Sequence, residues 1–226
     1  MANFGFYASI EAIRRSFIEH KMNWKTISKV AIESDAVEVA LFWRMWEVMV
    51  PVLEMAIWGD ESYRSDVTAN PRKGRGRWRV YVKVKFTRGG YKYSLLMFQD
   101  INGVVAHKIF FGAVDEELFN DWIVEHLARH LNVYGLPRSV VVIDNVPFHH
   151  NDTLFHIIDT IGAVLVHLPR YMPLLNLAEQ GFRDIKAIER SKCIYGELEG
   201  LLSLNDSVLS IKNKNYRETL REMGYE

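Results

Sequence analysis

The chain has 226 residues, of which 49% are hydrophobic and 25% are charged, with 28 basic and 28 acidic side chains. This composition is typical of a globular protein with one large domain or two small ones. A single cysteine, Cys193, and the lack of zinc-site spacing exclude a disulfide-stapled secreted scaffold and a zinc finger. Without a secretory or transmembrane segment, we expect a soluble protein, in the nucleus of a eukaryote or otherwise in the cytoplasm.

Residues 9–50 are predicted to be helical, because apolar side chains recur three and four positions apart. Val37 and Leu41 belong to this pattern, and the helical spacing of Trp43 and Trp46 indicates that these two rings lie in the core. Pro51 ends this helical region.

The apolar run 52–58 predicts a buried strand, and the polar residues 59–62 predict a turn that closes it. Asp60 should therefore lie at the end of this strand. Two further strands are predicted at 91–100 and 104–111. An Asp-Ile-Asn-Gly turn joins them and gives the strongest hairpin signal in the sequence, so these strands should pair antiparallel.

A basic segment lies between the first predicted strand and this hairpin. Residues 67–99 contain no acidic side chain and nine of the 28 basic ones, which leaves 19 basic against 28 acidic side chains elsewhere. Proline and glycine predict a loop or hairpin at its start, and alternation favours a strand at 78–86. This asymmetry indicates a surface that faces a polyanion, although a solvated loop could have the same composition. The basic residues are Arg72, Lys73, Arg75, Arg77, Arg79, Lys83, Lys85, Arg88 and Lys92.

The second half of the chain alternates helices and strands. Helical periodicity is present at 115–131 and 152–161, and a last core helix is expected from Asn176 to about Arg190. The continuous apolar runs 140–143 and 163–168 are typical of strands covered on both faces. The order of strand, hairpin, helix, strand, helix, strand and helix predicts an α/β fold whose mixed sheet is flanked by helices.

Three acidic side chains occupy positions that folding alone does not favour. Asp60 and Asp144 each follow an apolar strand, where open α/β sheets bind ligands. Glu179 lies three residues after Asn176, a candidate N-cap, and so falls in the first helical turn. Each position alone also fits a turn or capping role. Together the three would offer the oxygen ligands that Mg²⁺ prefers, in a cluster suited to two-metal phosphodiester displacement.

Other titratable side chains compete with these candidates. Asp100 or Asp115 could replace Asp60 as the first carboxylate, but a turn and a helix N-terminus explain these two adequately. For His107 and His150 a surface or packing role is about as reasonable as a functional one.

Two linked motifs occupy the region of the last two predicted strands. The first is Val-Val-Val-Ile-Asp144-Asn145-Val-Pro-Phe-His149. The second is Leu168-Pro169-Arg-Tyr171-Met-Pro173-Leu-Leu175-Asn176-Leu-Ala-Glu179, which continues to Lys186. With 34 residues between Asp144 and Glu179, the pair resembles the catalytic core of the mariner superfamily of cut-and-paste transposases, in the branch shared with bacterial insertion elements. The Asp60-Glu61-Ser62 segment resembles the family's first catalytic segment, and the resemblance covers roughly residues 52–190.

This resemblance implies a ribonuclease H-like fold and a catalytic triad of Asp60, Asp144 and Glu179 with Mg²⁺ or Mn²⁺ as cofactor. It implies double-stranded DNA, as transposon ends and target, among the partners, no membrane partner, and leaves room for a homodimer. The basic residues from Arg72 to Arg88 are the expected DNA contacts. Supporting roles at the site are assigned to Asn145, His149, Asn176 and Lys186.

The sequence departs from the family at Met172, where serine is usual, and at Leu177-Ala178, where Pro-Ile is common. The helix should still begin there, because losing this proline removes a preset φ angle but no hydrogen bond. We predict a helical linker region at 1–50, a ribonuclease H-like catalytic domain at 51–195 with a basic hairpin insertion at 67–92, and a helical tail at 196–226. Family members usually carry N-terminal helix-turn-helix domains, so the chain is predicted to be truncated.

The expected function is transposase-type DNA strand cleavage and strand transfer by two-metal phosphodiester displacement. One alternative is a catalytically inactive or domesticated remnant that acts as a DNA-binding or oligomerisation module. Another is a nuclease that acts without terminal repeats.

Overall fold

The computed structural model describes residues 35–65, 92–146, 149–190 and 197–225, together with a few positions between 9 and 20. By its internal contacts the chain divides into two units, Met1–Val30 and Ala31–Glu226. In the first unit the backbone N–H of His20 donates to the carbonyl of Ser16 at 3.0 Å, as in one helical turn. The second unit contains the sheet and the candidate site.

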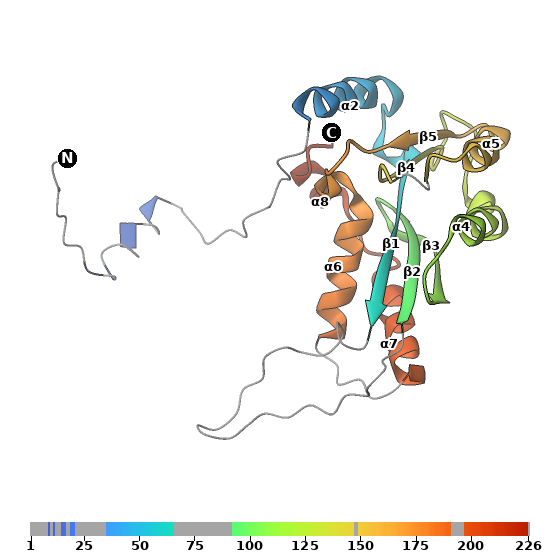
Figure 1. The fold of residues 1–226 in the computed structure, drawn as a ribbon. Coiled ribbons are helices and arrows are strands. Elements are labelled where there is room, and N and C mark those ends of the chain that lie inside the picture. Colours follow the sequence, from blue (N-terminus) through green and yellow to red (C-terminus); the bar gives the residue numbers. More distant parts are fainter. Residues whose placement is uncertain are drawn as a thin grey trace. The chain divides into compact units, whose positions relative to one another are not determined.

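The second unit is built on a five-stranded sheet with the strand order β3-β2-β1-β4-β5 (Figure 1). β1 pairs antiparallel with β2, and β2 pairs antiparallel with β3. β4 is parallel to both β1 and β5, so the predicted mixed sheet is confirmed. The strands are β1 (Ala56–Ser65), β2 (Lys92–Asp100), β3 (Gly103–Phe111), β4 (Val140–Ile143) and β5 (Val164–His167).

Helices cover both faces of this sheet, with α4 and α5 on one face and α6 and α7 on the other (Figure 1). Among the described residues, none of the helices combines the length and the apolar character that a membrane-spanning segment needs. The helices are α2 (Ala36–Met49), α4 (Glu116–Trp122), α5 (Asp152–Ile161), α6 (Leu177–Glu189), α7 (Glu197–Ser210) and α8 (Arg217–Glu222). Shorter helical turns are Leu53–Met55, Ile123–Leu127, Ala128–His130 and Pro173–Leu175.

Alternation along the strands divides the core between the two faces of the sheet. Trp58 and Val142 pack in a cluster with side chains of α2, α6 and α8. Ile57 and Ile143 pack in a second cluster with side chains of α4 and α5. Because β4 is buried on both faces, its sequence is a continuous apolar run, as predicted.

The chain after residue 196 contributes to the same core. Leu204 and Val208 of α7 pack with α6 and β2, and Tyr225 packs in the cluster of Trp58. The division into a linker region, a catalytic domain and a tail stays a prediction.

The prediction that Trp46 lies in the core is confirmed, and Trp43 packs against the same cluster. Val37 and Leu41 are 66% and 61% exposed, whereas Phe42 and Trp46 are buried. The ring of Trp46 lies edge-on to that of Tyr225, with the ring centroids 4.6 Å apart. The helix has apolar side chains on two sides, and the side with the larger aromatic rings offers more area to bury.

The β2–β3 hairpin is confirmed, and its turn follows from local chemistry. The backbone N–H of Asn102 donates to Oδ1 of Asp100 at 2.7 Å. Gly103 has a φ of +114°, a conformation that favours glycine, and a Cβ there would lie 2.2 Å from the carbonyl oxygen of Lys212. The strand predicted at 78–86 lies outside the described residues.

Candidate active site

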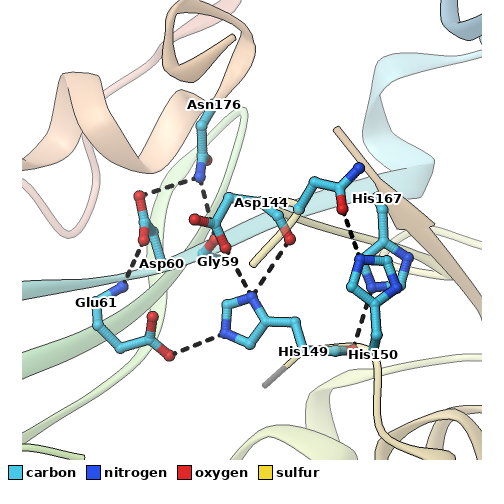
Figure 2. A network of polar contacts seen from close by, with 9 residues as sticks. Gly59, Asp60, Glu61, Asp144, His149, His150, His167 and Asn176 are labelled. Atoms are coloured by element: carbon cyan, nitrogen blue, oxygen red, sulfur yellow. Dashed lines mark hydrogen bonds and ion pairs between the residues drawn. The ribbon is translucent and has the colours of Figure 1, made fainter. Parts of the chain in front are cut away.

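Asp60 and Asp144 lie at the same edge of the parallel part of the sheet (Figure 2). The register pairs Trp58 with Val142, so each aspartate comes two residues after this pair and points to the same face. Asp144 directly follows β4, as predicted. The prediction that Asp60 ends its strand is wrong, because β1 continues to Ser65 by pairing with β2 alone. The parallel pairing of β1 with β4, in contrast, ends at Trp58, before Asp60.

Glu179 lies in the first turn of α6, a helix that packs on this face of the sheet. The side chain of Asn176 caps this helix by accepting a hydrogen bond from the backbone N–H of Ala178 at 3.0 Å, which confirms the predicted N-cap. Nδ2 of Asn176 donates to the carbonyl of Gly59 and to Oδ2 of Asp60, both at 3.2 Å. The buried cap therefore ties the start of α6 to β1.

Negative charge accumulates around the Asp60 carboxyl. Burial raises the pKa of Asp60 well above its usual value, and the charges of Asp144, Glu61 and Glu179 raise it further. The backbone N–H of Glu61, which donates to Oδ1 of Asp60 at 2.7 Å, lowers this pKa but does not offset the increase. A bound cation would remove the repulsion among these carboxylates.

His149 lies between the carboxylates of Asp144 and Glu61 (Figure 2). Its Nδ1 is 2.7 Å from Oδ1 of Asp144, and its Nε2 is 3.2 Å from Oε1 of Glu61. Burial alone would lower the pKa of His149, but the hydrogen bonds and charges of the two carboxylates outweigh burial and raise this pKa to about 9. The imidazole is therefore charged at neutral pH.

Further contacts hold the loop that carries Asp144. Nε2 of His167, at the end of β5, donates to the carbonyl of His149 at 3.1 Å. The ring of His167 stacks on that of His150, with the centroids 4.0 Å apart, and Nε2 of His150 lies 2.6 Å from Oδ1 of Asn145. Nδ2 of Asn145 donates to Oε1 of Glu38 on α2 at 3.4 Å. The loop is thus attached to a neighbouring strand and to a helix.

A cleft of about 780 Å³ opens beside Asp144. The loop after β4 and the turn after β5 line it. Tyr171 in that turn has a φ of 58°, a left-handed conformation that is uncommon outside glycine, and its ring is exposed. The cleft leaves Asp144 accessible to an extended ligand.

Asp60, Asp144 and Glu179 offer only oxygen ligands, which is the donor set that Mg²⁺ prefers, and their mutual repulsion also fits a cation. Within the described ranges, however, no three Asp, Glu, His or Cys side chains are close enough to hold a metal ion together. Two of the carboxylates have protein partners, since Asp60 contacts Asn176 and Asp144 contacts His149. Convergence of the triad on one metal position stays a prediction.

The other predicted site residues are less close to this network. Lys186 is exposed on α6, two turns beyond Glu179, and no contact among the described residues joins it to the carboxylates. The expected DNA contacts fall in the segment between β1 and β2 that lies outside the described residues. They are Arg72, Lys73, Arg75, Arg77, Arg79, Lys83, Lys85 and Arg88.

Sequence reasoning did not identify Glu61, Glu38 or His167 as part of the site. Glu61 could have been considered, because it adjoins Asp60 in the strand. The contact of Glu38 with Asn145 spans 107 positions, and no local pattern indicates such a contact.

Comparison with known proteins gave one family match. A model described as DDE superfamily endonuclease matches residues 56–201, which run from the start of β1 into α7. No curated protein matches the sequence.

The fold is similar to solved structures of the Mos1 transposase. The strand transfer complex has a TM-score of 0.66 and 15% identity, covering 94% of this chain and 66% of that chain. The paired end complex with Mn has a TM-score of 0.66 and 15% identity, covering 95% and 68%. For the catalytic domain alone the values are 0.58 and 12%, covering 83% and 85%. The likeness confirms the ribonuclease H-like fold, and the chain spans about two thirds of the transposase length.

Proposed function

Because the chain belongs to the DDE superfamily of endonucleases, we propose that it cleaves DNA strands and transfers them, with Asp60, Asp144 and Glu179 as the catalytic triad. One observation carries the proposal: Asp60 and Asp144 lie at the same edge of the parallel part of the sheet, where the charges of Asp144 and Glu179 both raise the pKa of Asp60. A divalent cation bound there, Mg²⁺ or Mn²⁺, would neutralise this charge and polarise a phosphodiester group.

The triad side chains act as ligands in this proposal and accept no proton. Asp60 and Asp144 extend from the sheet edge, and Glu179 adds the third carboxylate from α6. His149 orients Asp144 by an ion pair, and Asn176 orients Asp60 by a hydrogen bond.

The chemistry is a pair of phosphodiester displacements. In cleavage, water forms the new P–O bond while the bond from phosphorus to the 3′ oxygen breaks, which frees a 3′-hydroxyl. In strand transfer, this hydroxyl attacks a phosphodiester of the target and displaces another 3′ oxygen. The cleft beside Asp144 gives a strand access to the site.

The proposed partner is double-stranded DNA, as transposon ends and target. The Mos1 structures include a strand transfer complex and a paired-end complex with the left transposon end. By analogy with the pairing of ends, we propose a homodimer as the working assembly. The basic residues between Arg72 and Arg88 would contact the phosphate backbone.

Nicking of a supercoiled plasmid tests the proposed activity. The wild type should nick the plasmid in the presence of Mg²⁺ or Mn²⁺, and nicking should cease when EDTA removes the cation. Glu179→Gln should reduce the rate by about 100-fold or more, because even groups outside the first ligand shell account for about 10–100-fold. The control Asp159→Asn changes an exposed carboxylate on α5 and should leave the rate unchanged.

Nicking that survives Glu179→Gln at the wild-type rate would contradict the triad. A wild type that binds DNA but nicks it with neither cation would contradict catalysis. That result would indicate the DNA-binding or oligomerisation remnant.

A further inference from the structure

We propose that Glu61 is a positioning residue that holds the Asp144 carboxylate through the imidazole of His149. This inference rests on the proposed function, in which Asp144 is a metal ligand. In this inference the Glu61 carboxylate contacts neither the metal ion nor DNA. The evidence is the continuous contact from Glu61 to His149 and from His149 to Asp144 (Figure 2).

Glu61 approaches the site from the opposite face of the sheet. Asp60 and Glu61 are neighbours on β1, so their side chains point to opposite faces. The face of Glu61 carries the cluster that contains Phe119, and the ring of His149 packs on Phe119 with the centroids 4.9 Å apart. His149 therefore lies on the same face of the sheet as Glu61, and its ring contacts Asp144 beyond the end of β4.

Both nitrogens of His149 are engaged, which fixes the orientation of the ring. Nδ1 contacts Asp144 at 2.7 Å and Nε2 contacts Glu61 at 3.2 Å, and the residue is only 1% exposed. Loss of the contact with Glu61 would remove one of the two carboxylate contacts that orient the ring. The position of the Asp144 carboxylate would then be less restricted.

The two ends of this contact chain differ in rigidity. Glu61 lies within β1, the central strand, where it pairs with Leu96 of β2. Asp144 lies in a loop just after a strand of four residues. Glu61 is therefore the fixed end, and Asp144 is the end that needs support. Partners that orient metal ligands in this way typically account for about 10–100-fold in metal affinity or activity.

Glu61 also acts on the site through its charge, because it raises the pKa of Asp60 directly. The two effects depend differently on His149. If Glu61 acts by positioning, its effect requires the imidazole ring of His149 and should disappear when the ring nitrogens are removed. A direct effect of charge should persist without them. A double-mutant cycle separates these cases.

The cycle uses Glu61→Ala, Glu61→Gln and His149→Phe, in which phenylalanine keeps the packing on Phe119. In metal-free protein, ¹⁵N relaxation of the backbone amides of Asp144 and Asn145 measures how firmly the loop is held. Glu61→Ala and His149→Phe should lower the order parameters to a similar extent, and the double variant should lower them no further. Glu61→Gln keeps an acceptor oxygen and should behave like the wild type.

Mn²⁺ affinity, measured by calorimetry, is the second readout. Glu61→Ala should weaken binding about tenfold and Glu61→Gln less than about threefold, and the double variant should match His149→Phe alone. The control Glu125→Ala removes an exposed carboxylate and should change neither readout. Melting temperatures establish that each variant is folded, and Glu61→Leu replaces Glu61→Ala if alanine prevents folding.

Additive effects in the cycle, or a glutamine variant as impaired as the alanine variant, would show that Glu61 acts through its charge and would overturn the proposal. Unchanged amide dynamics in Glu61→Ala would overturn it as well, whether or not the protein binds Mn²⁺. Failure of the wild type to bind Mn²⁺ would contradict the proposed function and leave the relaxation result to decide on Glu61.

Discussion

At Asp60, burial and three neighbouring carboxylates raise the pKa of a side chain that the fold holds through Asn176 and the backbone of Glu61. A carboxyl whose pKa is higher in the folded state than in the unfolded state destabilises the fold when it ionises. Below the unfolded pKa of about 4 this penalty is absent, and as the pH rises above that value it develops. The candidate site therefore reduces the stability of the metal-free protein at neutral pH.

We predict that Asp60→Asn raises the melting temperature of the metal-free protein at pH 7. The difference from the wild type should shrink as the pH falls and disappear below about 4, where the wild-type carboxyl is protonated in both states. Each kcal/mol gained corresponds to roughly 2–4 °C for a chain of this length. Thermal unfolding across this pH range measures the difference. A lower melting temperature for Asp60→Asn at pH 7 would show that its hydrogen bonds outweigh the charge repulsion.

Among the elements, α6 has the closest bearing on the site, because it carries Asn176 at its cap and Glu179 in its first turn. Nε2 of the buried Gln99 on β2 donates to the carbonyl of Leu177 at 2.6 Å. Near the other end of α6, the buried Glu189 pairs with the buried Arg64 of β1. The helix is therefore attached to the sheet at both ends.

Gly181 permits the close approach of α6 to β2. A Cβ at this position would lie 2.2 Å from Oε1 of Gln99 and 2.6 Å from the methyl carbon of Met97. We predict that Gly181→Ala lowers the free energy of unfolding by about 1–3 kcal/mol, as overpacking typically does. It should also weaken Mn²⁺ binding, because the displaced helix carries Glu179. Urea unfolding measures the first effect, with the exposed Lys186→Ala as control, and an unchanged or higher free energy of unfolding would contradict the close packing.

The basic segment between β1 and β2 is the element expected to contact DNA. Each phosphate neutralised contributes about −0.9 to the slope of log affinity against log salt concentration. If Arg72, Lys73, Arg75 and Arg77 each meet one phosphate, changing all four to alanine should flatten this slope by roughly 3 to 4 units. Filter binding over a range of salt concentrations measures the slope.

In this experiment the melting temperature and the Mn²⁺ affinity should not change. A matched control changes four exposed basic residues elsewhere to alanine and should leave the slope nearly as it is. These four are Arg44, Arg129, Lys212 and Arg221. If the quadruple variant of the basic segment melts normally and keeps the wild-type slope, the segment is only a solvated loop.

At the scale of the whole molecule, the order of the elements could be predicted because each has a local signal. β4 is a continuous apolar run, the β2–β3 turn ends in glycine, and Asn176 is a good N-cap. The extension of β1 beyond Asp60 could not be predicted, because its polar residues resemble a turn. Pairing with β2, which begins 32 positions after Asp60, is what keeps them in the sheet.

The candidate site likewise combines residues that stand in local motifs with contacts between positions far apart in the sequence. Asp144, Asn176 and Glu179 stand in local motifs, so the sequence indicates them directly. The contact of His149 with Glu61 joins positions 88 residues apart, and its partners become neighbours only through the sheet register. A single sequence contains no local pattern for such a pair.

We propose that the triad holds a divalent cation, and Mn²⁺ calorimetry on the wild type and Asp144→Asn is the decisive test. Asp152→Asn, an exposed aspartate at the start of α5, is the matched control. We expect Asp144→Asn to weaken Mn²⁺ binding by about tenfold or more, while the control binds like the wild type. Equal Mn²⁺ affinity in the wild type and Asp144→Asn would show that Asp144 is not a ligand of the cation.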